Sequence, residues 1–210
     1  MSKSFFSFFL SVLVFILFTL FYGKMLRLRE PSLAEKLSEQ KKEFVRNPKI
    51  VIHTARNLLD FSDGDLLLKR YKINLGHSDF ALAKKENKYI TTPHGVFAIC
   101  DAYKSDKYFF VLVLDYPDSA TIIKARKNGL ISRKTAEEML AKTKYGCNTK
   151  FDKKIFGPQI TIHGFGKVDF LLGNLPFAFN WTDGSIALSD GDLEELLPYL
   201  KIGTKIRITN

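Results

Sequence analysis

Two short segments near the C-terminal end carry residue types that could break an amide bond. The first ends in His163-Gly164, and the second contains Gly184-Ser185 about twenty residues later. Attack on an amide needs a nucleophile, a base that takes its proton, and donors for the oxyanion that forms. A lone histidine in a β-rich run is usually structural. The ordered pair of segments favours a functional interpretation, with His163 as the base and the Gly184 turn presenting backbone N–H groups to the oxyanion.

The residues around this pair extend the pattern. Its two segments read Ile160-Thr161-Ile162-His163-Gly164 and Asn180-Trp181-Thr182-Asp183-Gly184-Ser185-Ile186-Ala187, and flanking elements read Thr92-Pro93-His94-Gly95-Val96-Phe97, Leu114-Asp115-Tyr116-Pro117 and Gly203-Thr204-Lys205-Ile206. In this order, over roughly Lys49 to Thr209, the chain resembles the YkuD-type L,D-transpeptidase catalytic domain. It is similar to the subfamily in which alanine, here Ala187, follows the nucleophile by two.

The resemblance implies a catalytic role for four residues. His163 would be the general base, and the backbone carbonyl of Gly164 would orient its ring. Residue 185 occupies the position of the nucleophile, and Gly184 would give a backbone N–H to the oxyanion.

The resemblance also implies substrate contacts. The residues just before the nucleophile position are candidates, namely Trp181, Thr182 and Asp183. The commonest family pattern has a supporting arginine where this chain has Ala187, so substrate carboxylates need other donors. The candidates lie in a basic stretch and are Lys124, Arg126 and Arg133, with a solvated basic loop as the alternative interpretation.

Ser185 departs from the family, which has cysteine at this position. A thiol with a pKa of about 8.5 is readily ionised by an imidazole, whereas a hydroxyl usually needs a carboxylate behind the histidine. Only a backbone carbonyl is expected there. Three interpretations stay open: a Cys→Ser replacement introduced into the chain, a natural pseudoenzyme, and a working serine nucleophile, which Asp183 would have to support.

The function implied by the resemblance is peptidoglycan tailoring without a cofactor. The enzyme would attack the L,D amide bond of a tetrapeptide stem and pass the acyl group to an amine or to water. The acceptor, whether a second stem, a lipoprotein lysine or water, stays open. The alternative is a non-catalytic cell-wall binding or regulatory protein of the same fold. We expect no metal site, because His53, His77 and His94 lack metal-ligand spacing and are interpreted as structural.

Residues 1–29 predict a membrane anchor. No charge occurs from Phe5 to Tyr22, and the sequence after it lacks the small residues of a cleavage site, which favours an uncleaved signal anchor. Lys24, Arg27 and Arg29 follow the apolar run, so the positive-inside rule taken alone keeps the domain in the cytoplasm. We nevertheless expect the domain outside the inner membrane, in the cell envelope, where the implied substrate lies.

The remaining pattern predicts a mainly β domain of the α+β type, barrel-like or sandwich-like, over residues 49–210. A linker helix is expected within 30–48, before Pro48. The predicted strands are 50–52, 57–61, 66–75, 95–99, 108–115, 159–163 and 205–209, with an Asp-Gly hairpin between the second and third. Two helices are expected, at 132–142 with a Thr135/Glu138 capping box and at 192–200 with Asp192 as N-cap.

Charge and cysteine content limit the partners. The net charge is +10, of which four positive charges belong to the first 29 residues. A basic surface suits anionic polymers or membranes, and no nucleic-acid-binding motif is present, so no nucleic-acid partner is expected. Cys100, in an apolar run, is interpreted as a small core residue, and Cys147 lacks the context of a nucleophile. A single bridge between the two stays open.

Overall fold

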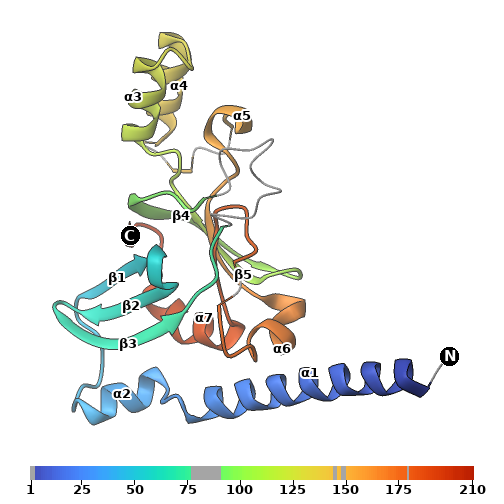
Figure 1. The fold of residues 1–210 in the computed structure, drawn as a ribbon. Helices are drawn as coiled ribbons and strands as arrows, with labels where there is room; N and C mark the ends of the chain where they lie inside the picture. The colour runs from blue at the N-terminus through green and yellow to red at the C-terminus, as the bar shows by residue number, and fades with distance from the viewer. Residues whose placement is uncertain (1–2, 77–90, 144–145, 148–149, 179) are drawn as a thin grey trace.

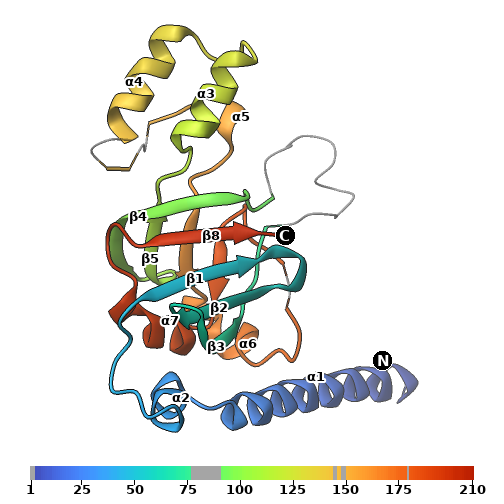
Figure 2. The same ribbon diagram turned by 90° about the vertical axis from the view of Figure 1, so that its left-hand side faces the viewer.

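An eight-stranded sheet forms the body of the protein. The computed structural model describes residues 3–76, 91–143, 146–147, 150–178 and 180–210. The strands are β1 (Pro48–His53), β2 (Leu58–Asp63), β3 (Leu66–Lys72), β4 (Gly95–Ser105), β5 (Phe109–Leu114), β6 (Thr161–Gly164), β7 (Ile186–Leu188) and β8 (Lys205–Thr209). Their order in the sheet is β3-β2-β1-β8-β4-β5-β6-β7, and Figures 1 and 2 show its strong curvature.

The two edges of this sheet meet. Most neighbouring strands are antiparallel, while β1 pairs with β8 and β6 with β7 in parallel. Just beyond β3, Asn74 exchanges both backbone hydrogen bonds with Ala187 of β7, each 2.8 Å long. Because β3 and β7 are the edge strands, this contact nearly closes the sheet into a barrel. The expected mainly β, barrel-like domain with short helices is confirmed.

The predicted strands are present, with shifted ends. The Asp-Gly hairpin joins β2 to β3, and Gly64 has a φ of +62°, a left-handed conformation that glycine adopts without a Cβ penalty. The third predicted strand ends at Lys72 instead of at residue 75. β4 continues to Ser105, six residues beyond the predicted end. The sequence did not predict β7, which is three residues long.

The core lies inside the curved sheet and is closed by α7 (Asp190–Leu196). Alternate residues of the strands, such as Ile50 and Ile52 of β1, point inward and are buried. Leu193 and Leu196 of α7 are fully buried against them. The N-cap of α7 is Ser189, whose hydroxyl accepts from the backbone N–H of Asp192, so the prediction of Asp192 as the cap was wrong by one turn.

A helical hairpin, α3 (Ser119–Lys127) and α4 (Arg133–Thr143), stands off from the sheet on the side opposite the N-terminal helix (Figures 1 and 2). It has a small core of its own together with α5 (Lys153–Phe156): Ile122, Ala125, Ala136, Met139 and Phe156. The predicted helix at 132–142 is α4, but its capping box is not Thr135/Glu138. The hydroxyl of Ser132 accepts from the N–H of Thr135 at 3.1 Å instead. α3 was not predicted.

The N-terminal segment forms two helices. α1 (Lys3–Arg29) is the one helix in the described part of the chain that is long and apolar enough to cross a membrane. α2 (Leu33–Glu39) is shorter than the linker helix expected within 30–48, and it begins with a capping box between Ser32 and Glu35. Its Leu33 and Leu37 are buried in the main core, so this helix is attached to the domain.

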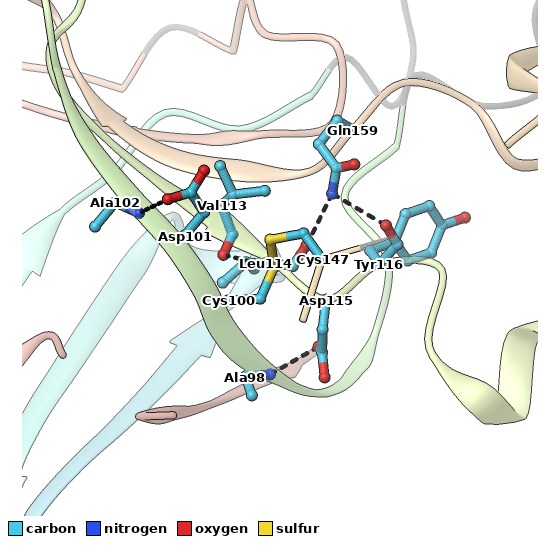
Figure 3. Close-up of a disulfide and its surroundings, with 10 residues drawn as sticks. All are labelled: Ala98, Cys100, Asp101, Ala102, Val113, Leu114, Asp115, Tyr116, Cys147 and Gln159. Atoms are coloured by element: carbon cyan, nitrogen blue, oxygen red, sulfur yellow. Dashed lines mark hydrogen bonds between the residues drawn. A yellow bond between two sulfur atoms is a disulfide. The ribbon is translucent and has the colours of Figure 1, made fainter. Parts of the chain in front are cut away.

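Cys100 and Cys147 form a disulfide with Cα atoms 5.2 Å apart (Figure 3). The interpretation of Cys100 as a small core residue was therefore wrong, and the single bridge that the sequence left open is present. The register of β4 against β5 shifts between Ile99 and Asp101, so Cys100 is the extra residue of a β-bulge. A bulge re-aims one side chain out of the alternation, and here Cys100 is half-buried and reaches Cys147 beyond α4.

Candidate active site

The pairing of β6 with β7 places His163 and Ser185 on one face of the sheet. Ile162 lies opposite Ile186 in the parallel register, which sets Ser185, one residue before β7, beside Thr161. Opposite residues share a face, as do residues two apart on one strand, so Thr161, His163 and Ser185 form one group. His163 is 5% exposed and Ser185 is 8% exposed.

The ring of His163 is held by the next residue. Its Nδ1 lies 2.8 Å from the carbonyl oxygen of Gly164, and a carbonyl only accepts, so Nδ1 carries the hydrogen and Nε2 keeps a free lone pair. Burial lowers the pKa of His163 below its usual value, the hydrogen bond to Gly164 raises it, and the charge of Lys107 lowers it. The imidazole is therefore neutral near pH 7, in the tautomer that a general base needs.

Two aromatic side chains flank the imidazole. The ring centroid of Tyr108 lies 4.5 Å from that of His163, and Trp181 makes an edge contact at 5.8 Å. The Nζ of Lys107 lies 4.7 Å from the centre of the Tyr108 ring. The indole Nε1 of Trp181 is buried and has no hydrogen-bond partner among the residues that the structure describes. The site therefore has aromatic walls, an adjacent cation and one unused donor.

Close packing behind the histidine requires glycine. A Cβ on Gly164 would lie 2.4 Å from Oδ1 of Asp190 and 2.9 Å from the carbonyl oxygen of Tyr108. Gly166 donates its N–H to the same Asp190 carboxylate at 2.8 Å. The backbone after His163 therefore packs tightly between the start of α7 and the β4–β5 turn. This packing fixes the position of the Gly164 carbonyl, which orients the His163 ring.

The turn before Ser185 also depends on glycine. Gly184 has a φ of +95°, and a Cβ there would come 3.2 Å from the carbonyl oxygen of Thr91. The hydroxyl of Thr182 donates to the carbonyl oxygen of Ser185, which closes the turn from below. In the described part of the chain, the backbone N–H groups of Gly184 and Ser185 donate to no turn or loop carbonyl, so both are free to bind an oxyanion.

The hydroxyl of Ser185 is turned toward Thr161. Its Oγ accepts from the backbone N–H and from the hydroxyl of Thr161, each at 3.1 Å. No hydrogen bond joins Ser185 to His163 among the residues that the structure describes. Asp183 is exposed on the turn and makes no described bond to His163 either. The group behind the imidazole is the Gly164 carbonyl.

The other candidates lie apart from this group. Arg126 and Lys124 are exposed on α3, and Arg133 pairs with Glu137 on α4 at 2.8 Å. The hydrogen bonds and ion pairs of the described residues connect none of the three to His163 or Ser185, and their substrate contact stays a prediction. No group of metal-ligating side chains occurs in the described ranges.

The remaining histidines make local contacts. His94 shares a hydrogen bond with the Thr54 hydroxyl at 2.9 Å, and His53 lies 3.4 Å from Asp60. His77 lies outside the described residues.

Sequence reasoning missed Lys107, Tyr108 and Thr161 as parts of the site. Lys107 and Tyr108 lie in the turn between β4 and β5, more than fifty residues before His163. Only the antiparallel pairing of β5 with β6, which sets Val111 opposite His163, brings that turn to the site. Thr161 carried a usable signal, because it lies two residues before His163 in a predicted strand and therefore on the same face.

Comparison with known proteins agrees with this geometry. Residues 47–208 match the family described as YkuD, the L,D-transpeptidase catalytic domain, and the chain belongs to this family. No curated protein sequence matches.

Solved structures of similar fold include an L,D-transpeptidase from Mycobacterium smegmatis, with 11% identity, a TM-score of 0.45, and coverage of 78% of this chain and 59% of that one. Another is the helical cell shape determining protein Pgp2 from Campylobacter jejuni, with 16% identity, a TM-score of 0.44, and coverage of 85% and 55%. The chain thus spans somewhat over half the length of these structures.

Proposed function

We propose that the domain tailors peptidoglycan by acyl transfer at the L,D amide bond of tetrapeptide stems. The nucleophile at position 185 attacks the amide carbonyl and gives its proton to Nε2 of His163. The Gly184 and Ser185 N–H groups hold the oxyanion. His163 then protonates the leaving amine, and an amine or water takes the acyl group from residue 185.

The observation that carries this proposal is the 2.8 Å contact between Nδ1 of His163 and the Gly164 carbonyl. It leaves Nε2 as the proton acceptor on the face that Ser185 shares. Such an arrangement suits a thiol, which needs only a neighbouring base, better than a hydroxyl, which needs a carboxylate behind the histidine. The buried N–H of Trp181 and the cation of Lys107 would contact the stem peptide beside it.

A second candidate function rests on the state of the Ser185 hydroxyl. Because Oγ accepts two hydrogen bonds from Thr161 and makes none to His163, the chain with serine is held in a non-reacting arrangement. Tyr108, Trp181 and Lys107 would still be available beside the site to contact a stem peptide. The alternative is therefore a cell-wall binding or regulatory protein that recognises stems without cleaving them.

Replacing Ser185 by cysteine separates the two functions. We expect Ser185→Cys to convert tetrapeptide-containing muropeptides into cross-linked, trimmed or exchanged products, measured by mass spectrometry, and to form an adduct with a carbapenem at residue 185. The chain with Ser185 should do neither. Stem binding by both proteins, with turnover by neither, would support the binding function. Equal turnover by both would show that the hydroxyl is activated by a group such as Asp183.

We further propose that α1 stays attached as a membrane anchor with the domain on the outer side. The ion pair of 3.5 Å between Arg27 of α1 and Asp169 of the domain supports a retained helix. The disulfide supports the outer side, because such bonds persist in oxidising compartments. We give the disulfide more weight than the positive-inside count, which taken alone would keep the domain in the cytoplasm. The protein should fractionate with membranes at full length, and protease added to spheroplasts should digest it. A soluble form beginning near Lys24, or protection from the protease, would contradict the anchor or the orientation.

A further inference from the structure

An exposed apolar segment follows β6, the strand that carries His163. It comprises η3 (Gly166–Val168), α6 (Asp169–Leu172) and the chain to Phe177. Phe170 is 73% exposed, the largest value among the large hydrophobic side chains that the structure describes, and Phe177 is 58% exposed. Val168 and Leu171 are also exposed, at 41% and 38%. A soluble surface rarely gathers four such side chains without a partner.

The same segment packs against α1. Gly23 is buried, and a Cβ there would lie 1.8 Å from the carbonyl oxygen of Asn174, so the helix and the segment touch backbone to backbone. Arg27, one turn on, lies 3.5 Å from Asp169. Thr19 and Leu20, one turn back on the same face, are half-buried, whereas residues 5–18 are exposed. Figures 1 and 2 both show α6 beside the C-terminal part of α1.

The length of the apolar run in α1 determines the depth in a bilayer at which Gly23 contacts residues 166–177. The 19 residues from Phe5 to Gly23 carry no charge, and Lys24 is the first basic residue after them. At 1.5 Å per residue they span about 28 Å, close to the roughly 30 Å of the hydrocarbon core. The whole apolar run is needed to cross the hydrocarbon core, so Gly23 lies at the boundary between the hydrocarbon core and the headgroup region. Any segment that packs on Gly23 lies at the same level.

We propose that residues 166–177 form a second membrane contact, with Val168, Phe170, Leu171 and Phe177 inserted into the interface of the outer leaflet of the cytoplasmic membrane. The proposal rests on the retained anchor described above. Aromatic and aliphatic side chains are favoured at this depth, and exposed basic residues next to them, Lys24, Arg29 and Lys167, match anionic headgroups.

This contact fixes the orientation of the active site. β6 ends at Gly164 and runs directly into the segment, so His163 is held at a constant height above the bilayer. An ion pair of 2.8 Å between Lys72 and Glu30, just after α1, is a further link between the domain and the end of the helix. The domain therefore acts on stems close to the membrane, in contrast to a domain that moves freely on a flexible linker.

Fluorescence quenching in vesicles tests the contact. The full chain is reconstituted into phosphatidylethanolamine–phosphatidylglycerol vesicles, with a polarity-sensitive dye on one introduced cysteine. The described residues contain no free cysteine, because Cys100 and Cys147 are bonded to each other. The label positions are Phe170→Cys or Phe177→Cys in the segment, Leu13→Cys inside α1, and Leu130→Cys in the turn of the α3–α4 hairpin. Leu130 is 52% exposed, and the α3–α4 hairpin that carries it lies far from α1 in both ribbon views.

Lipids carrying a spin label near the headgroup should quench the dye at residues 170 and 177, with a blue shift of its emission, and leave the dye at residue 130 unchanged. Deep spin labels should quench residue 13. Quenching at 13 without quenching at 170 or 177 would refute the second contact and leave the anchor standing. Absence of quenching at 13 would refute the anchor, and the contact with it. Because only lipid is present, a protein partner of this surface would also appear as the first of these negative results.

Discussion

The Nδ1 atom of His163 donates to the carbonyl oxygen of Gly164, the residue that follows it in the chain, across 2.8 Å. Since the acceptor is backbone, it cannot ionise or be removed by a side-chain substitution. The histidine therefore keeps its Nε2 lone pair over the whole range in which the ring is neutral.

The first prediction concerns the base. In the Ser185→Cys background, His163→Ala should lower muropeptide turnover by about 10²–10⁴-fold, the usual contribution of a general base. The rate of carbapenem adduct formation at residue 185 should fall with it, because the thiol loses its proton acceptor. His94→Ala serves as the control, because among the described residues the His94 side chain bonds only to Thr54. Equal losses from both substitutions would indicate a general structural effect.

The second prediction concerns stability against pH. Burial lowers the pKa of His163 in the folded chain, whereas in the unfolded chain it lies near its ordinary value of about 6.5. Below pH 6.5 the unfolded state therefore binds a proton that the folded state does not, and stability should fall as the pH falls. Urea unfolding between pH 7.5 and 5 should show a smaller loss for His163→Gln. An equal slope in both proteins would contradict the lowered pKa.

The third prediction concerns the glycine behind the ring. Gly164→Ala places a Cβ 2.4 Å from Asp190 and should cost about 1–3 kcal/mol of unfolding free energy through overpacking. It should also lower turnover in the Ser185→Cys background, because the orienting carbonyl moves.

Gly129→Ala is its matched control. A Cβ there meets no atom within 4 Å, and its φ of +70° limits the cost to left-handed strain of about 1–2 kcal/mol. Stability loss without loss of turnover is expected for Gly129→Ala only. If Gly164→Ala also lost stability without losing turnover, the tight packing around Gly164 would not be what positions the histidine.

The fourth prediction concerns the disulfide. Its two cysteines are 47 residues apart, and the chain-entropy relation gives a stabilisation of about 4 kcal/mol for a loop of this length. The double substitution Cys100→Ala with Cys147→Ala should lower the unfolding free energy by up to that amount. Dithiothreitol should produce a similar loss in the parent chain and none in the variant. Protein isolated from cells and denatured under alkylating conditions should show no free thiol, and two free thiols would contradict export.

The fifth prediction concerns Lys107. Its exposed ammonium lies next to Tyr108 and His163, where a stem carboxylate would meet it. Lys107→Met in the Ser185→Cys background should raise KM roughly two- to fivefold, the range for an exposed charge pair, with little change in kcat. The acidic limb of the pH–rate profile should move to higher pH, because Lys107 lowers the pKa of His163. Lys104→Met, on the same hairpin, should change neither quantity.

The meeting of two candidate segments could be predicted from the sequence because each segment is short and local. The His163-Gly164 and Gly184-Ser185 segments each contain their own strand end or turn, and the structure places them side by side. The sequence did not indicate that the β4–β5 turn contributes side chains to the site. Lys107 reaches the site only through the pairing of β5 with β6, a contact between distant parts of the chain.

Element ends were less predictable, for identifiable reasons. Ser189 and Asp192 are both good N-caps, and three residues separate them, so the sequence alone does not decide which one begins α7. Cys100 falls within a continuous apolar run, and only the bulge turns it toward Cys147. A bulge adds one residue without any required residue type, which leaves no signal in the pattern.

The position of β8 has a consequence for the newly made chain. The last strand to be synthesised, Lys205–Thr209, is inserted between β1 and β4, near the middle of the sheet. Until it emerges from the ribosome, β1–β3 and β4–β7 are two half-sheets that each expose a row of unpaired backbone groups. The two half-sheets therefore cannot join until residues 205–209 are present, and a chain cut before Lys205 should leave the edges of β1 and β4 open to pairing with other chains.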